Sequence, residues 1–408
     1  MTTTRHRTAP RLLADPGGRG EIRFRGADLI EEVRRADLRG HGGGGFPTWR
    51  KMRAVADGRG RRVVVANGTE GEPASRKDET LLAHDPDLVI DGALAAAEAV
   101  GADEVVLAVA RDNPAIGIAA DAVARRPQRR GRRLSLAAAP PRFVTGEESA
   151  LVGWLNGGPA VPTITPPRPS DRGVRRRPTL VQNVETLAHV ALIARHGADW
   201  FREAGTPEEP GTTLVTIGGA VRVPGVHEVA LGTPLGDVLA QAGGPAGEIG
   251  GVLTGGYSGA WLETDEPWSV PLSAAGLRAA GGVLGTGTVM VLPGEVCPFA
   301  ETARLAGYLA GESAGQCGPC VFGLPDLSRA VAGLASGRGT VAAVEEIREV
   351  LPLIERRGAC AHPDGVARLV RSAVRAFPGE LDLHMRGGCS GVGWAPAFPV
   401  PARAEGRR

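Results

Sequence analysis

The sequence predicts three structural units in order: an α/β domain, a small β-rich domain of the β-grasp type, and a C-terminal bundle of four helices. Three changes of pattern along the 408 residues support this division. Strand, loop and helix patterns alternate over 20–205, short strands and turns follow over 212–293, and amphipathic helical segments fill 299–386. The remaining tail, 387–408, is rich in glycine and proline and is predicted to be loose.

The α/β domain begins with a helical pattern and continues with alternating elements. FRGADLIEEVRRADL at 24–38 carries apolar residues at helical spacing, and a glycine cluster, RGHGGGGFPTWRKM, occupies 39–52. RRVVVANGTEGEPASRKDETLL at 61–82 reads as a β-branched strand that runs into a polar loop. LVIDGALAAAEAVG at 88–101 is a helix that ends at a glycine, and EVVLAVA at 104–110 is a buried strand. This alternation is typical of an α/β fold.

The second unit has short strands and turns, with one helix predicted at 234–242. The stretches VLTGGYSGAWL and GTVMVLPG continue that pattern. The third unit is helical throughout and reads as a packed bundle, because each segment is apolar on one side only. Its four predicted helices are 299–313, 324–337, 340–358 and 365–384.

Composition excludes several classes of protein. The net charge of +2 gives no general case for nucleic acid binding. The arginine-rich stretches 125–133 and 172–177 are interpreted as solvated loops, with docking of an acidic partner as the alternative. No signal peptide is visible and no apolar run is long enough for a membrane span, so we expect a cytoplasmic protein without one.

The cysteines are confined to the C-terminal part of the chain. An odd number of cysteines without a secretory signal does not indicate a disulfide framework. GQCGPC at 315–320 has the spacing of a redox dithiol, and equally that of two thiolate ligands of a metal or an iron–sulfur cluster. The five cysteines are Cys297, Cys317, Cys320, Cys360 and Cys389.

The glycine cluster at 40–45 satisfies G-x-G-x-x-G literally, but its context differs from a dinucleotide-binding fingerprint. A helical pattern precedes it and Phe46-Pro47 follows, whereas the fingerprint follows a strand and opens a helix. Four consecutive glycines still let backbone N–H groups approach a phosphate or a flat ring. Lys51 lies just beyond the cluster and supplies a positive charge.

Two polar loops carry pairs of acids and suggest the rim of a ligand site. The loop at 66–79 holds Glu70 and Glu72, and the segment 145–155 holds Glu147 and Glu148 before an apolar helical stretch. Acids at the start of a helix are also favoured by its dipole, so helix capping is the alternative for the second pair.

An ordered series of segments then carries a specific likeness. The chain resembles the flavin- and NADH-binding 51-kDa subunit of respiratory complex I and the related subunits of NAD-reducing hydrogenases and formate dehydrogenases, as a shortened and divergent member. The likeness covers roughly residues 25–386. Its matching segments are LRGHGGGGFPT (38–48), NGTEGEP (67–73), KDETLLAHDPDLVIDG (77–92), GEESAL (146–151), PTLVQNVETLAHV (178–190), GGYSG (255–259), ESAGQCGPC (312–320) and GAC (358–360).

The resemblance implies an FMN-binding α/β domain at 20–205, a soluble-ligand-binding β-grasp domain at 212–293 and a four-helix iron–sulfur bundle at 299–386. It implies that the cofactors, FMN and a nicotinamide nucleotide where one binds, are held by a set of residues drawn from the polar loops. These are Gly40, Gly42, Gly43, Phe46, Lys51, Asn67, Glu70, Glu72, Gly146, Glu147, Glu148, Gln182 and Asn183. Glu72 and Glu148 would contact the nicotinamide or its ribose, and Phe46 belongs to the nucleotide side.

The resemblance also favours cluster ligation over dithiol chemistry. The family takes three ligands from a C-x-x-C-x-x-C run and a fourth from a later loop, but Ala314 stands where the first ligand belongs. Cys317, Cys320 and Cys360 are therefore expected to ligate. Cys389 is the expected fourth ligand, with Cys297 or His362 as alternatives, and a three-iron centre is the other possibility to a four-iron cluster.

The nicotinamide nucleotide side departs further from the family. Ala54 aligns with an adenine-stacking aromatic residue, and TPPRPSD places Thr165 and Arg168 where the family has lysine and phenylalanine. Either the guanidinium plane of Arg168 replaces the lost stacking, or NADH is no longer the substrate.

Three functions follow from these features. The first is an electron-transfer flavoprotein that passes electrons from a reduced donor, with NADH as a candidate, through FMN to an iron–sulfur centre and a partner such as a ferredoxin or a small component of a larger complex. The second is a non-catalytic assembly or binding module that uses the turn at Gly255, Gly256 and Gly259. A dithiol oxidoreductase based on Cys317 and Cys320 is the third.

Overall fold

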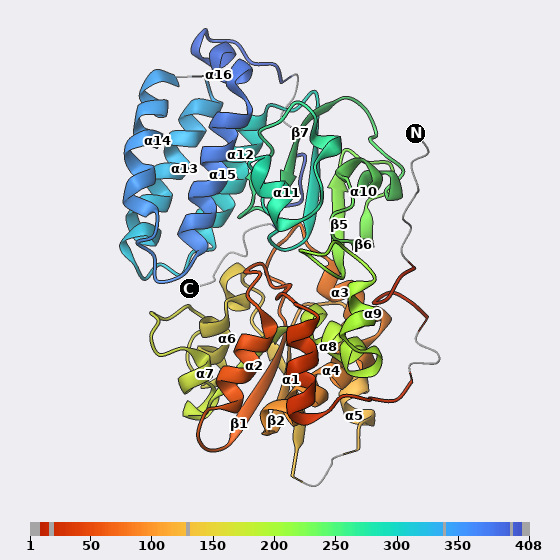
Figure 1. Ribbon diagram of the computed structural model, residues 1–408. Coiled ribbons are helices and arrows are strands. Elements are labelled where there is room, and N and C mark those ends of the chain that lie inside the picture. Colours follow the sequence, from red (N-terminus) through yellow and green to blue (C-terminus); the bar gives the residue numbers. More distant parts are fainter. Residues whose placement is uncertain (1–8, 16–19, 128–130, 338–339, 392–394, 402–408) are drawn as a thin grey trace.

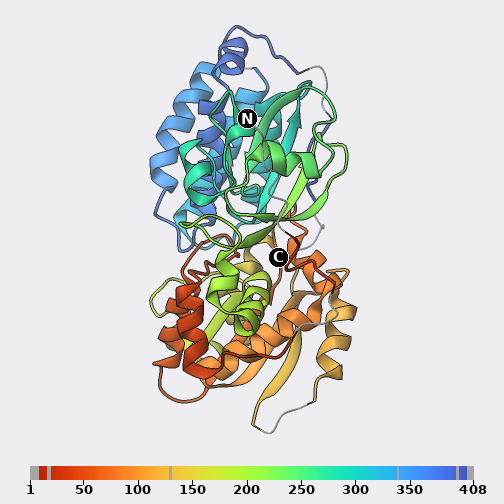
Figure 2. The same ribbon diagram turned by 45° about the vertical axis from the view of Figure 1, so that its right-hand side comes forward.

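The computed structural model describes residues 9–15, 20–127, 131–337, 340–391 and 395–401. The α/β domain forms one half of the molecule (Figure 1). The β-rich domain and the helical bundle lie side by side in the other half. Figure 2, turned by 45°, keeps the same two halves and shows the β-rich domain in front of the bundle.

The α/β domain contains four parallel strands in the order β3-β2-β1-β4. The strands are β1 (Arg62–Gly68), β2 (Ala102–Ala110), β3 (Arg133–Ala139) and β4 (Thr179–Asn183). The helices are α1 (Gly26–Arg35), α2 (Thr48–Ala56), α3 (Lys77–His84), α4 (Pro86–Val100), α5 (Ile116–Arg125), α6 (Glu148–Leu155), α7 (Pro169–Arg172), α8 (Val184–His196) and α9 (Ala198–Arg202). The order of strands reverses between β1 and β4, and ligands of such sheets bind at the carboxyl ends of the strands at that point.

Close packing of helices fixes this sheet from both faces. Helices α4 and α8 run so close together that a Cβ at Gly92 would lie 1.8 Å from the Leu187 carbonyl oxygen, so only glycine fits there. The opposite face packs against α6, where Leu151 and Val152 contact the inward side chains of β1. The sheet is therefore rigid, and its loops carry the candidate site.

The second unit has five strands in the order β6-β5-β9-β7-β8. The central strand β9 is parallel to its neighbour β5, and the other pairs are antiparallel, which is the arrangement of a β-grasp sheet. The elements are β5 (Thr212–Gly219), β6 (Gly225–Ala230), α10 (Leu235–Gln241), β7 (Ile249–Thr254), β8 (Ala260–Trp261), α11 (Ala274–Ala279) and β9 (Thr288–Pro293).

The third unit places α12 to α15 side by side, with the short α16 at one end (Figure 1). The helices are α12 (Pro298–Gly311), α13 (Leu324–Ala335), α14 (Thr340–Ile354), α15 (His362–Ala376) and α16 (Pro378–Met385). The sequence predicted one helix over 365–384, but the helix is interrupted at Phe377. Proline lacks an N–H donor and disfavours helical backbone in the residue before it, so Pro378 starts a new helix.

The second and third units share one hydrophobic core, although the sequence predicted them as separate domains. Trp261 of β8 is fully buried, and its indole N–H donates to the Thr302 hydroxyl of α12 over 3.0 Å. Tyr257 and Phe299 belong to the same buried cluster. The boundary near residue 296 is thus a change of secondary structure within one packed body.

The prediction of a loose tail is wrong for residues 395–401. Phe398 is 2 % exposed and stacks on Trp261 with ring centroids 6.0 Å apart. The Phe398 N–H donates to a Glu301 carboxylate oxygen over 3.0 Å, and the Tyr257 hydroxyl donates to the Pro399 carbonyl. Burial of one aromatic ring outweighs the turn-rich composition, while 392–394 and 402–408 lie outside the described residues.

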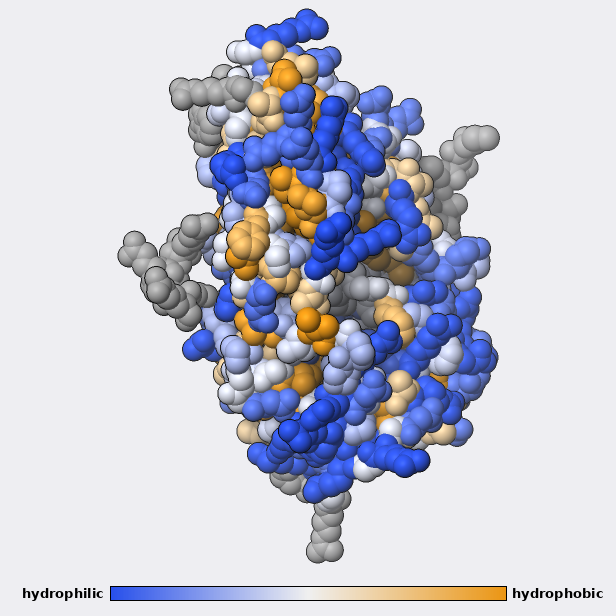
Figure 3. Space-filling model, turned by 90° about the vertical axis from the view of Figure 1, so that its left-hand side faces the viewer, coloured by the Kyte–Doolittle hydropathy of each residue, from blue (hydrophilic) through white to orange (hydrophobic). Residues whose placement is uncertain are grey.

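The surface over the outer bundle helices is hydrophilic with a few apolar patches between (Figure 3). Exposed apolar side chains of the bundle include Val321, Phe322, Val341 and Leu353. No helix among the described residues has the length and hydropathy that a membrane crossing requires.

Phe398→Ala is expected to destabilise the protein by about 3 kcal/mol, because it empties a buried aromatic site. The free energy of unfolding in denaturant measures this. Phe322→Ala is the matched control, since that ring is 70 % exposed and its loss should change stability by less than about 0.5 kcal/mol. Equal effects of the two variants would contradict a docked tail.

Candidate functional site

The glycine cluster forms an open loop at the carboxyl edge of the sheet. The loop closes on itself through the Gly40 N–H, which donates to the Phe46 carbonyl over 3.0 Å. Gly43 has φ of +99° and Gly45 has φ of +57°, values that side-chain-bearing residues rarely adopt. Residues 42–46 are exposed, so a ligand can approach this backbone directly.

His41 anchors the loop to two neighbouring elements. Its backbone N–H donates to the Thr186 hydroxyl over 2.9 Å, and its ring Nδ1 lies 3.0 Å from a Glu185 carboxylate oxygen. Glu185 in turn accepts the Leu214 N–H of β5 over 2.8 Å. His41 therefore ties the glycine loop to α8 and, through Glu185, to the β-grasp domain.

Lys77 lies beneath this loop with 3 % exposure. Its ammonium donates to Asp78 over 2.6 Å and to Asn183 over 3.2 Å, and it lies 2.9 Å from Glu185. Burial by itself lowers the pKa of Lys77, but the charges of Asp78 and Glu185 outweigh it and raise the pKa above its ordinary value. The side chain of Asn183 is occupied in this network, where it also caps α8.

Lys51 and Glu148 form an ion pair across the opening, from α2 and from the start of α6. Both side chains are about one third exposed, which leaves them accessible to a ligand. Nearby, the Asn67 amide donates to the Gly146 carbonyl over 2.9 Å. The structure thus brings Lys51, Asn67, Gly146 and Glu148 together around the glycine loop.

Gln182 lies at the end of β4 under the loop. Its amide oxygen lies 4.0 Å from the position of a Cβ built at Gly40. The side chain is buried, and its amide nitrogen has no hydrogen-bond partner within the described part of the chain. A buried donor without an acceptor is costly, so this atom is suited to a ligand oxygen or ring nitrogen.

Two of the predicted site carboxylates serve as helix caps. The two Glu70 oxygens accept the Asp78 and Glu79 N–H groups at the start of α3, each over 3.0 Å. Glu147 accepts the Ser149 and Ala150 N–H groups over 2.9 Å, as the capping alternative anticipated. The sequence did not reveal the role of Glu70, because it stands seven residues before the helix that it caps.

Glu72 lies between two domains and is closed to solvent. Its carboxylate accepts the Tyr257 N–H over 2.9 Å, and a Cβ at Gly256 would lie 2.4 Å from that carboxylate. Burial raises the pKa of Glu72 to about 7. Glu72 therefore holds the Gly255–Gly259 turn of the β-grasp domain onto the α/β domain.

Three thiols meet at the end of the bundle nearest the α/β domain. Cys317 follows α12, Cys320 lies in a π-helical turn over Pro319–Gly323, and Cys360 lies in the loop before α15. Burial raises the pKa of Cys320 to about 12, and the neighbouring thiols of Cys317 and Cys360 add to the rise. The three thiols are therefore close enough to influence one another, which suits joint ligation of a cluster.

Cys389 and Cys297 cannot complete that ligand set, so the predicted fourth ligand is wrong. Cys297 precedes α12 and Cys317 follows it, and a helix of 14 residues separates them by roughly 20 Å. Cys389 lies with Cys297 at the far end. His362 lies two residues after Cys360, and its buried Nδ1 has no partner among the described residues.

The loop at 140–148 joins the glycine loop to the thiols. The Phe143 N–H donates to Glu312 over 3.1 Å, and the Phe143 ring lies 5.2 Å from the His362 ring. The Arg142 guanidinium donates to the Ser313 carbonyl over 3.4 Å. The same loop ends at Glu148, which pairs with Lys51, so one segment contacts both candidate sites.

The residues of the predicted nucleotide side surround an exposed surface. Phe46 is 41 % exposed, and Ala54 and Arg168 are also exposed. Helix α7, which Arg168 precedes, packs against α2, which carries Ala54. Arg168 is thus placed near the helix from which the adenine-stacking ring is missing.

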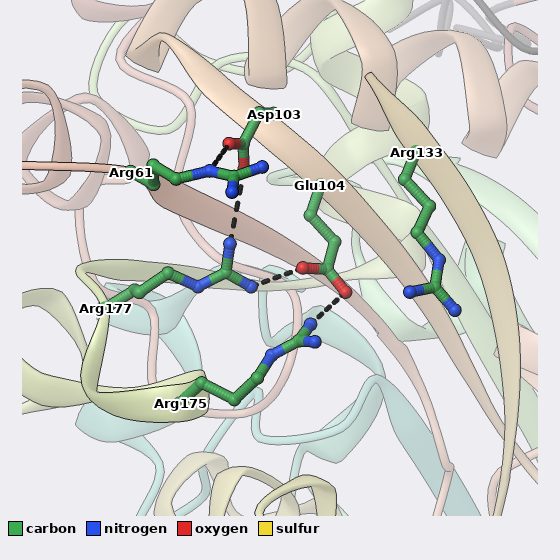
Figure 4. Close-up of a pocket in the computed structure, with 6 residues that line it drawn as sticks. All are labelled: Arg61, Asp103, Glu104, Arg133, Arg175 and Arg177. Carbon is green, nitrogen blue, oxygen red and sulfur yellow. Dashed lines mark hydrogen bonds and ion pairs between the residues drawn. The ribbon is translucent and has the colours of Figure 1, made fainter. Parts of the chain in front are cut away.

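A separate pocket of about 410 Å³ lies at the opposite edge of the sheet (Figure 4). Glu104 pairs there with Arg175 and Arg177, and Asp103 pairs with Arg61. Ligands of parallel sheets bind at the carboxyl ends of strands, whereas this pocket lies at the amino ends. These arginines therefore pair with structural carboxylates, and the candidate site is elsewhere.

The open glycine loop at a strand-order reversal and the nearby thiols define a class of flavin- and cluster-binding proteins. Family models match residues 33–192 (Nuo51 FMN-binding domain), 214–251 (SLBB domain) and 300–384 (NADH-ubiquinone oxidoreductase-F iron-sulfur binding region). The chain belongs to the family of the NADH-quinone oxidoreductase F subunits. These matches confirm the predicted resemblance and the predicted order of the three units.

Individual relatives agree with this assignment. The chain is 33% identical over 395 residues to the NADH-quinone oxidoreductase F subunit of Streptomyces coelicolor, covering 92% of this chain and 88% of the relative. It is 31% identical over 374 residues to the second such F subunit of Rhizobium meliloti, covering 88% and 89%. An air-oxidized NAD+-reducing [NiFe]-hydrogenase structure matches with TM-score 0.81 and 32% identity, covering 91% of this chain and 64% of that chain.

The chain has the FMN-binding domain and the iron–sulfur region of its family, and its residues fit both groups. The exposed glycine backbone and the unpaired Gln182 amide are suited to FMN. The three gathered thiols are suited to a cluster.

Glu72 predicts a pH dependence of stability. Its pKa rises from 4.5 to about 7 on folding, so the folded state binds this proton more tightly. Glu72 therefore contributes about 3 kcal/mol to the free energy of unfolding at a pH below its unfolded pKa. This contribution is lost as pH rises through about 7. Thermal unfolding midpoints of wild type and Glu72→Gln, measured from about pH 5 to about pH 8, test this.

Glu72→Gln should make stability fall less steeply as pH rises, while Glu208→Gln, at an exposed site, should leave the fall unchanged. Burial also raises the pKa of Asp78 to about 7, so part of the fall should remain in Glu72→Gln. A fall in Glu72→Gln as steep as in wild type would contradict the role of Glu72.

Proposed function

We propose that the protein is an NADH-linked electron-transfer flavoprotein that reduces a partner iron–sulfur protein. The observation that carries the proposal is the placement of the loop at 140–148. Its Glu148 pairs with Lys51 at the flavin-binding opening. Its Phe143 contacts Glu312 and His362, which lie near the three thiols in sequence. A segment shared by two redox sites keeps them close, as electron transfer requires. Bound FMN supplies the conversion between two-electron and one-electron chemistry.

The flavin side is held by backbone and by a few polar groups. Gly42 to Gly45 leave room for a ring or phosphate against the main chain, and Lys51 supplies a positive charge at the rim. Glu148 orients the Lys51 ammonium, and the Gln182 amide offers an unused donor from below. The helix-capping Glu70 and Glu147 act indirectly, by fixing the loops that carry the binding groups.

The placement of residues around the exposed surface supports NADH as the electron donor more strongly than the types of those residues do. Phe46 and Arg168 border the exposed surface next to α2, where a planar nicotinamide nucleotide can stack on a ring and a guanidinium. The relatives are NADH-quinone oxidoreductase F subunits and an NAD+-reducing hydrogenase. Their names support NADH as the donor for this chain.

The acceptor side lies next to Cys320. Val321 and Phe322 follow it in the π-helical turn and are 44 % and 70 % exposed. An apolar surface beside a buried thiol suits a protein partner that takes electrons from the cluster. We infer that the partner is an iron–sulfur protein that docks on this turn.

Anaerobic purification followed by flavin and iron analysis, and then by addition of NADH, tests the function. We expect bound FMN, iron held by Cys317, Cys320 and Cys360, and loss of flavin absorbance with NADH. A yellow protein that NADH does not bleach would rule out NADH as the donor. A colourless protein without flavin or iron would instead support the non-catalytic binding module.

Lys51→Arg is expected to weaken FMN binding by about tenfold or more, because a planar guanidinium does not fit where a compact ammonium sits beside Glu148. Equilibrium titration with FMN, followed by flavin fluorescence, measures this. Arg53→Lys is the matched control, since that exposed residue stands on the same helix. Unchanged affinity in Lys51→Arg would place the flavin elsewhere.

Phe322→Glu is expected to slow electron transfer to a ferredoxin by about tenfold or more, because it places a charge in an apolar contact. Steady-state reduction of ferredoxin by NADH measures this, and reduction of ferricyanide should stay unchanged. Val341→Glu, also at an exposed apolar site of the bundle, controls for added charge. Equal ferredoxin rates in both variants would argue against docking at the turn.

A further inference from the structure

Four potential metal ligands gather at the end of the bundle opposite the iron–sulfur thiols. Cys297 precedes α12, Glu380 and His384 lie one turn apart on α16, and Cys389 lies in the tail just after α16. Their ligand atoms all lie within 4.8 Å of one another. Three separate segments of chain thus converge on one point.

The distances within this group approach those of a tetrahedral metal site. His384 Nε2 lies 3.4 Å from Cys297 Sγ and 2.9 Å from a Glu380 oxygen. Ordinary zinc–sulfur and zinc–nitrogen bonds, set at the tetrahedral angle, separate the two ligand atoms by about 3.5 Å. Only small side-chain movements are needed to place an ion between them.

The orientation of His384 is that of a metal ligand. Its ring is 1 % exposed, and Nδ1 lies 2.8 Å from the Leu334 carbonyl oxygen, which can only accept. Nδ1 therefore carries a proton, and Nε2 points at Cys297 and Glu380. Metal-binding histidines are held in this way by a carbonyl on the remote nitrogen. A cation between Nε2 and the Glu380 oxygen would also relieve the contact between their lone pairs.

The tail is positioned to bring Cys389 into the group. The Ser390 N–H donates to Glu380 over 3.1 Å, and the Gly391 N–H donates to Cys389 Sγ over 3.4 Å. A Cβ at Gly391 would lie 2.9 Å from the Cys297 nitrogen, so the tail passes directly over the start of α12. Backbone N–H groups aimed at a sulfur atom and a carboxylate are suited to ionised ligands.

We propose that Cys297, His384, Cys389 and Glu380 bind one zinc ion, separate from the iron–sulfur cluster. Two thiolates, an imidazole and a carboxylate are a donor set that zinc accepts in tetrahedral geometry. All four positions are filled by protein, so the site is structural. The ion clips the tail to α12 and α16, just before the tail enters the seam where Phe398 packs.

Metal analysis of the purified full-length protein tests the proposal. Protein incubated with equimolar zinc and then dialysed should hold about one zinc ion per chain. Cys389→Ser and His384→Gln should each lower the zinc content by about tenfold or more and leave FMN and iron unchanged. Cys360→Ser is the matched control, because it should lose iron and keep zinc.

Circular dichroism and cobalt substitution extend the test to folding and to metal geometry. Cys389 is exposed, so Cys389→Ser should fold with an unchanged circular dichroism spectrum. Cobalt in place of zinc should give visible bands of tetrahedral geometry and thiolate charge-transfer bands, both lost in this variant. Protein that retains no zinc, zinc that persists in Cys389→Ser, or a Cys297–Cys389 disulfide found by mass spectrometry in protein purified without oxidant would each overturn the proposal.

Discussion

Glu185, in the first turn of α8, is contacted by three other segments of the chain. Its buried carboxylate pairs with Lys77 of α3 and with His41 of the glycine loop, and it accepts the Leu214 N–H of β5. The charge of Lys77 outweighs the cost of burial and lowers the pKa of Glu185 well below its ordinary value. Loss of Lys77 would remove the opposite charge from this buried carboxylate, at a cost of about 3–5 kcal/mol. The glycine loop, the sheet edge and the β-grasp domain are therefore positioned by one ion pair.

The candidate site is built between units rather than inside one. Glu72 of the α/β domain holds the β-grasp turn at Gly256, and Phe143 reaches His362 at the start of α15. The β-grasp sheet and the bundle share a core around Trp261. Contacts from the α/β domain therefore reach both of the other units, and these contacts position the glycine loop relative to the bundle.

The helical bundle has different chemistry at its two ends. The thiols of the iron–sulfur region face the α/β domain, whereas the Cys297 and His384 group stands at the far end beside the tail. Helix α12 separates the two groups by its full length, so no side chain can belong to both. Each end joins segments that are distant in the sequence, so both contribute to holding the bundle closed.

Sequence patterns alone predicted the order of the three units, the family and the glycine loop, and they led to the prediction that Cys317, Cys320 and Cys360 ligate a cluster. Strand alternation, helical periodicity and glycine runs are local patterns, and ordered motifs need no three-dimensional information.

The roles of Glu70 and Glu72, the docking of the tail at Phe398 and the separation of Cys389 from Cys317, Cys320 and Cys360 became visible in the folded structure alone. Each depends on which distant segments pack together. A carboxylate that caps a helix, closes a domain interface or contacts a ligand looks the same in the sequence, because the difference lies in the groups that folding brings to its oxygen atoms.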